Sequence, residues 1–471
     1  MFQGHSDARG IAFNGSGRGA ITISHIYIST AFIYLATQSA GCNVNDKSTC
    51  NAEVYGFKPS SLVAMIATAS GILAAFLMPL IGAIIDYTPH RKTAGILSAV
   101  MIWLIQFAQI WTNSQTWFAM LILQAINGFV YQVQFLATFS YFPEIAGVVG
   151  QQTMNSFITK FRMIQFGSEV VFIVIITALS LGLKSSDVIL SRYSQILSFI
   201  WIGICFYFGW KTLPQVPPKR ILLSDQSVLT AGFIQTLKTV KNINTNYGGS
   251  LRWYFLAVIF AEAGANAFTA LAVTFMNVVL EMSSMQIGIM FLVVLVFSIP
   301  GTKVGEMVTN WSNPKTSWRL CLAFFSVVTA VGSAVLSGPE RQNIAYLFGL
   351  LWGLCLGWFY PVEELMFSMT CPAGVEAELT GFYVYCTNIL AWLPPLIFTS
   401  MNQHGVSMQW GLLSLVLFFV IGIMLLFLMD PWDKVITRRT TEEGAEMGNV
   451  NVTNDGVEIA RINATAGDIY Y

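Results

Sequence analysis

The chain has 471 residues, of which 55% are hydrophobic and only 10% are charged, and its formal net charge is zero. Because soluble domains carry about 25% charged residues, this composition excludes a soluble globular protein. It predicts an all-α integral membrane protein, since a chain inside a bilayer must satisfy its backbone hydrogen bonds within helices. The balanced charge gives no indication of a nucleic-acid partner.

Twelve apolar segments approach or exceed the roughly 20 residues that a helix needs to cross a bilayer. These segments are 20–40, 60–82, 94–111, 117–140, 161–183, 193–211, 252–280, 285–302, 317–336, 343–369, 379–400 and 409–429. A long polar and basic stretch divides them six and six. We therefore expect an N-terminal tail (1–19), a first six-helix half (20–211), a cytoplasmic linker (212–251), a second six-helix half (252–429) and a disordered C-terminal tail (430–471).

The basic residues predict the orientation. With both termini in the cytoplasm, 19 of the 24 Lys and Arg residues lie on the cytoplasmic side, and the five others are Lys47, Lys58, Lys184, Arg192 and Arg341. The positive-inside rule therefore favours cytoplasmic termini. An inverted chain would instead expose to glycosylation the N-x-S/T sequons that begin at Asn14, Asn310, Asn451 and Asn463.

The first loop contains the sequence CNVNDKSTC, which begins at Cys42 and ends at Cys50. In an oxidising compartment these two thiols are a candidate disulfide, and in a reducing one they stay free. The other five cysteines lie in or beside apolar spans and are expected to be packing residues. No CxxC pair or histidine cluster predicts a metal site, and we expect no cofactor.

The stretch GAIIDYTPHRK (82–92) joins the second and third spans. Its Gly82, Asp86, Arg91 and Lys92 resemble the Gly-x-x-x-Asp-x-x-Gly-Arg-Arg/Lys pattern of the corresponding loop in the major facilitator superfamily. The resemblance implies a cytoplasmic gate in which the carboxylate caps a helix N-terminus and the basic residues bridge the bundle. The residues alone fit equally well a positive-inside anchor with a tight turn.

The second half has a comparable loop, TNWSNPKTS (309–317). Asn310 to Lys315 repeats the spacing of Asp86 to Arg91, with an amide in place of the acid, which weakens the second gate. Two six-helix halves related in parallel are what the transporter fold implies.

Two acids, Glu363 and Glu364, lie near the cytoplasmic end of the tenth span. We expect them to be gate partners of Arg91, Lys92 or Arg319 rather than ligands of a substrate.

Two further loops narrow the resemblance. FSYFPEIAG follows the fourth span and MTCPAGVEAELTGFYVY follows the tenth. They resemble the Leu-Pro-Glu/Asp and Pro-x-Gly-x-Glu-Ala-Glu-x-x-Gly-x-Tyr motifs of the vacuole effluxer family, the autophagy-related permeases that export amino acids from the vacuole. The matching residues are Pro143, Glu144, Pro372, Gly374, Glu376, Ala377, Glu378, Gly381 and Tyr383. The resemblance implies a twelve-helix transporter in a vacuolar or lysosomal membrane.

An ionisable side chain inside a span is costly and by default indicates function. Glu262 lies near the middle of the seventh span and shares a helical face with Asn266 and Thr269. Because the resemblance places this helix against the transport cavity, Glu262 is our first candidate for proton coupling or for binding an ammonium group. A structural hydrogen bond to a neighbouring helix is the alternative.

Other polar residues are candidates for the same pathway. Glu169, in the fifth span, is either a gate or ion-pair residue or a contact between helices. His25, in the polar first span, either titrates near neutral pH or acts as a satisfied hydrogen-bond donor. The remaining candidates line the cavity or contact other helices, and they are Gln124, Asn127, Tyr131 and Asn388.

No nucleophile–base pair, phosphate loop or metal-ligand spacing appears outside the spans, so we do not expect an enzyme. The leading hypothesis is a secondary transporter that moves neutral amino acids from the vacuole or lysosome to the cytosol by alternating access, with proton coupling. Its partners are then a small-molecule substrate, the lipid bilayer and protons. The alternatives are a transporter of another small solute at another membrane, and a non-transporting sensor or scaffold of the same fold.

Overall fold

The computed structural model describes residues 2, 4–44, 50–149, 151–183, 186–218, 227–245, 249–372 and 376–437. Within these ranges the chain is built from helices and contains no β-strand. Twelve helical segments are long and apolar enough to cross a membrane. The predicted motif residue Gly374, the sequons at Asn451 and Asn463, and the C-terminal tail from residue 438 lie outside the described residues.

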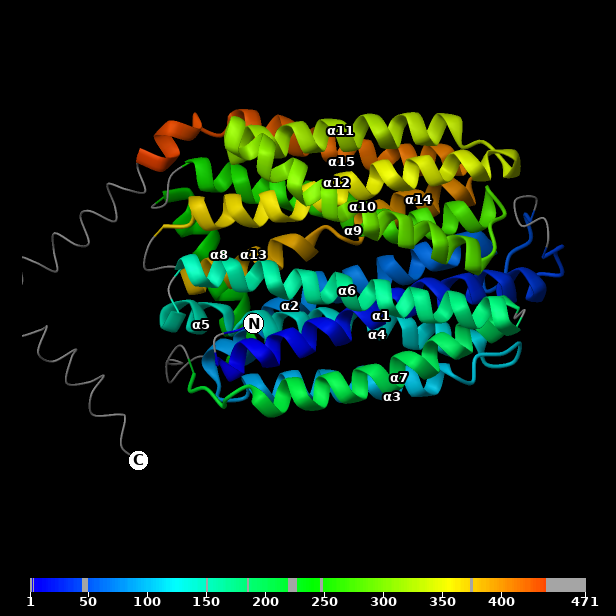
Figure 1. Ribbon diagram of the computed structural model, residues 1–471, viewed down its shortest axis with the longest axis horizontal. Coiled ribbons are helices and arrows are strands. Elements are labelled where there is room, and N and C mark those ends of the chain that lie inside the picture. Colours follow the sequence, from blue (N-terminus) through cyan, green and yellow to red (C-terminus); the bar gives the residue numbers. More distant parts are fainter. Residues whose placement is uncertain are drawn as a thin grey trace, which may run out of the picture.

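The helices form two halves that run side by side along the long axis of the molecule (Figure 1). The N-terminal half contains α1 (Ser6–Ser39), α2 (Leu62–Tyr87), α3 (Arg91–Gln109), α4 (Trp117–Phe139), the short α5 (Phe142–Val149), α6 (Gln151–Leu183) and α7 (Asp187–Thr212). The C-terminal half contains α9 (Gly249–Val278), α10 (Ser284–Trp311), α11 (Pro314–Val335), α12 (Gln342–Thr370), the pair α13 (Glu376–Ile389) and α14 (Leu393–Gln403), and α15 (Met408–Leu428). The prediction of twelve transmembrane helices is confirmed.

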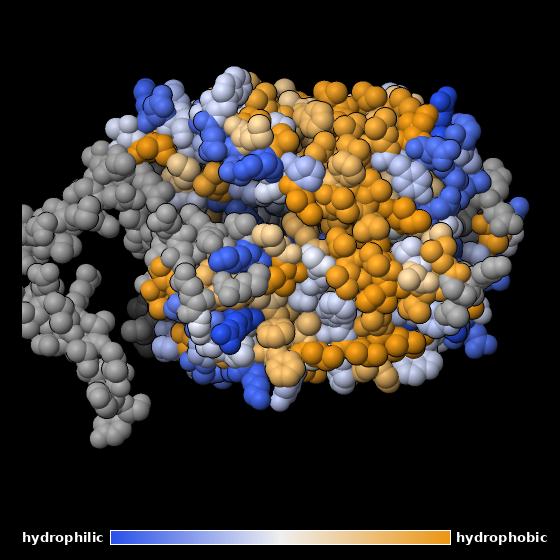
Figure 2. Space-filling model, in the orientation of Figure 1, coloured by the Kyte–Doolittle hydropathy of each residue, from blue (hydrophilic) through white to orange (hydrophobic). Residues whose placement is uncertain are grey.

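The surface has the pattern of a membrane protein. Figure 2 shows a belt of apolar side chains across the middle of one face, with hydrophilic residues towards both ends. Large apolar side chains are exposed on the outside of the bundle, including Phe76, Leu181 and Met424. Apolar patches of this extent are rare on soluble monomers, and lipid accounts for them here.

The first helix begins at Ser6, so residues 6–19 are not the polar tail that we expected. Small residues explain the difference, because they allow α1 to approach α7 closely. A Cβ atom on Gly10 would lie 2.9 Å from the carbonyl oxygen of Gly209, and the ring of Phe206 lies against Gly17. The segment is polar by composition and is nevertheless buried between helices.

The sequon at Asn14 lies inside this buried part of α1. Its side-chain amide donates to the Gly10 carbonyl at 3.1 Å, and its Oδ1 accepts from Gln134 Nε2 at 2.9 Å. Asn14 is fully buried. In this fold it is therefore a packing residue that cannot accept a glycan.

The predicted linker also contains a helix, α8 (Val228–Thr245). This helix packs against α2, where Gly232 lies directly on the carbonyl group of Pro79. Tyr87 at the end of α2 donates a hydrogen bond of 3.3 Å to Gln235. The linker is thus held on the N-terminal half.

The eleventh span is broken rather than continuous. α13 ends at Ile389 and α14 begins at Leu393. Pro394 and Pro395 follow the break directly, and prolines cannot donate the backbone hydrogen bonds that would continue the preceding helix. Gly71 of α2 leaves room for Trp392 at the break.

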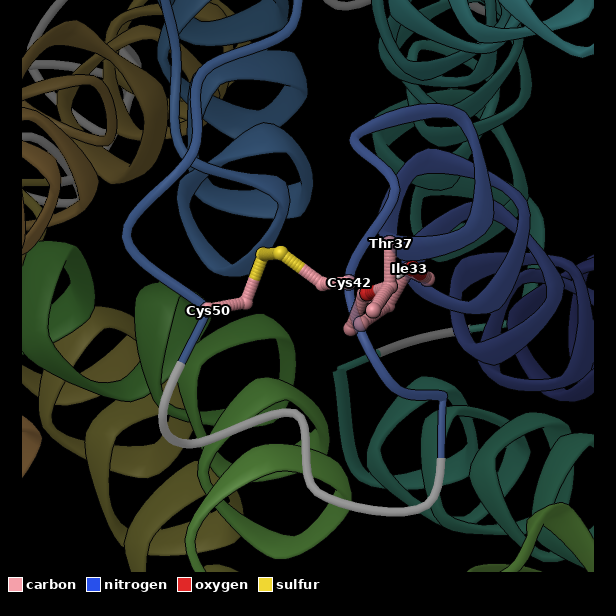
Figure 3. Close-up of a disulfide and its surroundings, with 4 residues drawn as sticks. All are labelled: Ile33, Thr37, Cys42 and Cys50. Atoms are coloured by element: carbon pink, nitrogen blue, oxygen red, sulfur yellow. Dashed lines mark hydrogen bonds between the residues drawn. A yellow bond between two sulfur atoms is a disulfide. The ribbon is translucent and has the colours of Figure 1, made fainter.

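A disulfide joins Cys42 and Cys50, which ties the end of α1 to the segment that leads into α2 (Figure 3). The Cys42 amide donates to the Thr37 carbonyl at 3.1 Å. We call this end of the bundle the disulfide end, and the opposite end, where α8 lies, the linker end.

Hydrogen bonds join the two halves at the disulfide end. The Thr30 and Ser284 hydroxyl groups of α1 and α10 are 2.6 Å apart. Asn402 of α14 donates to Ser60 and Ser61 in the short helix η1 (Pro59–Ser61), at 2.8 and 2.7 Å. The halves therefore meet at this end, which closes the space between them on that side.

Candidate functional site

A cavity of about 470 Å³ lies between the two halves. Its volume is in the range of small-molecule sites. The N-terminal half contributes polar side chains that include Arg18, Thr22, His25, Gln124, Tyr131, Arg162, Gln165 and Glu169. The C-terminal half contributes Glu262, Asn266, Thr269, Tyr360, Glu364, Tyr383, Thr387 and Asn388. All predicted pathway residues except Asn127 line this cavity.

Asn127 lies directly behind His25. Its side-chain nitrogen is 2.9 Å from His25 Nε2, so that the amide donates when this imidazole nitrogen is unprotonated. The contact joins α4 to α1. In this contact His25 Nε2 accepts the hydrogen bond rather than donating it, and the side chain also faces the cavity.

Glu262 of α9 faces the cavity, and Glu363 of α12 lies behind it. Glu363 Oε2 is buried without a hydrogen-bond partner among the described residues. Tyr383 Oη donates to Glu363 Oε1 at 2.9 Å, and Tyr254 Oη donates to the Glu363 carbonyl at 3.0 Å.

Glu363 is therefore not the gate residue that we expected. It is completely buried, and among the described residues it forms no ion pair with Arg91, Lys92 or Arg319. The prediction failed because Tyr383, which satisfies one of its oxygen atoms, comes from α13, distant in sequence.

Glu364, the adjacent residue, also departs from the predicted gate. It forms an ion pair with Arg162 of α6, which joins the two halves across the cavity. The Arg162 guanidinium lies over the Tyr360 ring, 5.9 Å from its centroid. Near Arg162, Glu169 Oε1 accepts a hydrogen bond of 3.1 Å from Gln165.

Arg91 is buried within the N-terminal half and does not bridge to the other half. It pairs with Glu144 at the start of α5, and its guanidinium lies over the Tyr141 ring at 5.2 Å. Burial raises the pKa of Tyr141 to about 12, so its neutral hydroxyl donates to the Pro214 carbonyl at 3.0 Å. This cluster holds α3, α5 and the start of the linker together.

Lys92, the basic residue next to Arg91, has a counterpart in the second half. Lys92 Nζ donates to the Leu213 carbonyl at 2.6 Å, just beyond the end of α7. Lys315 Nζ donates to the Met429 carbonyl at 2.7 Å, just beyond the end of α15. Cations are favourable at helix C-termini. By its contacts Lys315 therefore corresponds to Lys92 and not, as we expected from spacing, to Arg91.

The other predicted gate residues lie away from the main cavity. Gly82 and Asp86 line a smaller pocket of about 80 Å³ between α2, α8 and α13. Asn310 is exposed near the end of α10. The cap of α11 is instead Asn313, whose side chain accepts from the Thr316 amide at 2.8 Å.

Sequence reasoning did not assign several cavity residues to the pathway, among them Arg18, Tyr360, Tyr383 and Thr387. Arg18 was placed in the tail, although the small residues around it in GSGRG are a signal for close helix packing. The two tyrosines were not selected because neutral aromatic residues are common in spans.

The comparison with known families decides the identity. A family model described as "Vacuole effluxer Atg22 like" matches residues 17–434. The chain belongs to this family. An uncharacterised MFS-type transporter of Bacillus subtilis, YxiO, is 22% identical to this Atg22-like chain over 416 residues, which cover 85% of this chain and 90% of the relative.

Solved structures agree with this Atg22-like chain in fold. A D-xylose–proton symporter matches with a TM-score of 0.63 at 12% identity, over 91% of this chain and 98% of that one. The human organic anion transporter MFSD10 matches with a TM-score of 0.62 at 13% identity, over 89% and 99%. The nucleoside transporter NupG matches with a TM-score of 0.58 at 13% identity, over 90% and 100%. The protein is thus a multi-pass secondary transporter of the major facilitator type, and its relatives are not enzymes.

Proposed function

We propose that this Atg22-like transporter moves neutral amino acids from the vacuole or lysosome to the cytosol by alternating access, with proton coupling through Glu262. The observation that carries the proposal is the charge distribution of the cavity. Arg18 and Arg162 bring positive charge to its wall, and Glu169, Glu262 and Glu364 bring carboxyl groups. An amino acid carries one charge of each sign, so this wall can complement both ends of such a solute.

Proton coupling follows from the position of the two buried acids. Glu262 is accessible from the cavity and Glu363 is not, so Glu262 is the acid that can exchange a proton with the cavity. A solute ammonium group that approaches Glu262 competes with that proton for the same carboxylate. The binding of solute and the binding of proton are thereby linked.

Alternating access requires contacts between the halves that can open and close. Two sets are present: the hydroxyl and amide bonds at the disulfide end, and the Arg162–Glu364 ion pair across the cavity. The disulfide fits an oxidising compartment. It therefore supports a lumenal disulfide end and cytoplasmic termini, in line with the distribution of basic residues.

Reconstitution of the purified full-length chain tests this proposal. Proteoliposomes are supplied with labelled leucine and other neutral amino acids, with an imposed pH gradient and with the gradient collapsed by an ionophore. We expect uptake above that of protein-free liposomes, increased by the gradient. Absence of flux for every neutral amino acid, in protein that elutes as a folded species, would contradict the proposed substrate.

A further inference from the structure

Arg18 is held in the cavity wall by its glycine neighbours. Gly17 lies against the Phe206 ring of α7, and a Cβ atom on Gly19 would lie 2.7 Å from the Gln165 carbonyl oxygen of α6. These glycines let α1 pack against α7 and α6 on the sides next to Arg18. The Arg18 side chain itself lines the cavity between the halves.

The Arg18 guanidinium has no polar partner among the described residues. Only 7% of the residue is exposed, and Nη1 is buried without a hydrogen-bond acceptor. The guanidinium carbon lies 5.0 Å from the centroid of the Phe135 ring. Arg91 and Arg162, by contrast, each pair with a carboxylate.

The surrounding residues do not neutralise this charge. The Cγ atom of Glu169 lies against Gly19, the residue next to Arg18, but its Oε1 accepts from Gln165 and forms no ion pair with Arg18. Among the described residues, Tyr131 and Arg162 lie close enough to interact electrostatically with Arg18, and Arg162 carries a charge of the same sign. A buried cation without a counterion is unfavourable, so an anion that enters the cavity is attracted to this position.

Hydroxyl groups beside Arg18 complete a site for an oxyanion. Thr22, one turn further along α1, and Tyr131 of α4 both line the cavity, with their oxygen atoms 3.5 Å apart. The Thr22 hydroxyl donates to the Arg18 carbonyl at 3.1 Å, so the Tyr131 hydroxyl is the donor in the 3.5 Å contact and turns from Thr22 when it donates to a ligand. A planar guanidinium matches the two oxygen atoms of a carboxylate.

We propose that Arg18 binds a carboxylate group of the transported solute, with Tyr131 as an additional donor to the same group. The inference rests on the proposed function in one respect, namely that the solute occupies this cavity. It adds that the solute must carry a carboxylate, and that a solute without an amino group still binds through Arg18.

A set of analogues tests the carboxylate in the native protein. The thermal unfolding of the purified full-length chain is followed with L-leucine, with L-leucinamide, which lacks the carboxylate, with 4-methylpentanoate, which lacks the amino group, and with inorganic phosphate. We expect leucine and 4-methylpentanoate to raise the Tm and leucinamide to have no effect. Equal stabilisation by leucine and leucinamide, or no stabilisation by either carboxylate, would overturn the inference.

Variants then assign the effect to the residue. In Arg18→Gln we expect the apparent affinity for both carboxylates to fall at least about tenfold, because a charge-assisted bidentate bond is lost. Arg18→Lys should retain part of the affinity. Arg192→Gln is the matched control, since Arg192 lies outside the cavity and donates to the Thr112 carbonyl. An unchanged affinity in Arg18→Gln would contradict the assignment.

The outcomes separate this inference from the proposed function. If leucine is not transported but 4-methylpentanoate stabilises the native chain and not Arg18→Gln, the inference stands and the amino-acid substrate falls. If leucine is transported equally well by Arg18→Gln, the inference falls and the proposed function stands. Stabilisation by phosphate alone, dependent on Arg18, would replace the carboxylate by a phosphate-bearing solute. If Arg18→Gln does not fold, the analogue series in the native protein decides.

Discussion

Arg162 and Glu364 form an ion pair that connects the two halves of the bundle across the cavity. Arg162 lies on α6 and Glu364 on α12, and their side chains are 31% and 19% exposed. Because the partners belong to different halves, the pair breaks when the halves separate at this level. It therefore stabilises the conformation described here relative to one in which that side of the cavity is open.

The strength of this pair can be measured directly. A double-mutant cycle with Arg162→Met and Glu364→Gln should give a coupling free energy of about 2 kcal/mol, typical of a charge-assisted hydrogen bond away from bulk water. Thermal or denaturant unfolding in detergent is the measurement. The control is Lys303 and Glu306, a pair exposed by 67% and 55%, for which we expect about 0.5 kcal/mol. Equal coupling in both pairs would show that Arg162 and Glu364 do not hold the halves together.

Replacement of Arg18 and replacement of Arg162 should change the stability of the ligand-free protein in opposite directions. Since its buried charge has no counterion, we expect Arg18→Met to raise the free energy of unfolding by about 1 kcal/mol. Arg162→Met should lower it, because Glu364 loses its partner. The Tm values of the two variants without added solute test this pair of predictions. A loss of stability in Arg18→Met similar to that in Arg162→Met would indicate a structural role for Arg18.

Lys92 and Lys315 should have matching roles in the two halves. Each donates to a carbonyl group just beyond the last helix of its half, so we expect Lys92→Met and Lys315→Met each to lower the free energy of unfolding by about 1.5–3 kcal/mol. Lys303→Met, at an exposed position, is the control. An effect of only one of the two substitutions would contradict the correspondence between them.

The disulfide should stabilise the native chain, and a variant without the two cysteines should lack this contribution. Its loss is expected to cost about 2–3 kcal/mol, the range for closing a short loop. A reducing agent should therefore lower the Tm of the native protein and leave the Tm of Cys42→Ser/Cys50→Ser unchanged. A native Tm that is insensitive to complete reduction would show that the cross-link does not stabilise the disulfide end.

The twelve spans could be predicted because the hydropathy of each span and the charges beside it can be recognised from neighbouring residues alone. Residues 6–19 are the exception, since Asn14 and Arg18 make the segment polar although it is buried between helices. Their burial depends on α4, α7 and the cavity, which no local pattern reveals. The break before α14 was visible in Pro394 and Pro395, but its position beside Gly71 depends on tertiary packing.

The candidate site was predictable to the extent that it follows helical periodicity. Glu262, Asn266 and Thr269 share one face of α9, and that face lines the cavity. The partners of the charged residues could not be predicted in the same way. Arg91 pairs with Glu144 because α5 brings this carboxylate to the start of α3, and Glu363 is buried because α9 and α13 contribute the tyrosines that contact it. Such pairings between distant segments have no signature in one sequence.

Proton movement driven by the solute tests the central claim most directly. The native chain and Glu262→Gln are reconstituted around a pH-sensitive dye, and a leucine gradient is imposed with no pH gradient present. The account predicts a change in internal pH with the native chain and none with Glu262→Gln, while Arg192→Gln, a variant outside the cavity, behaves as the native chain does. An equal change in internal pH with both proteins would contradict coupling through Glu262.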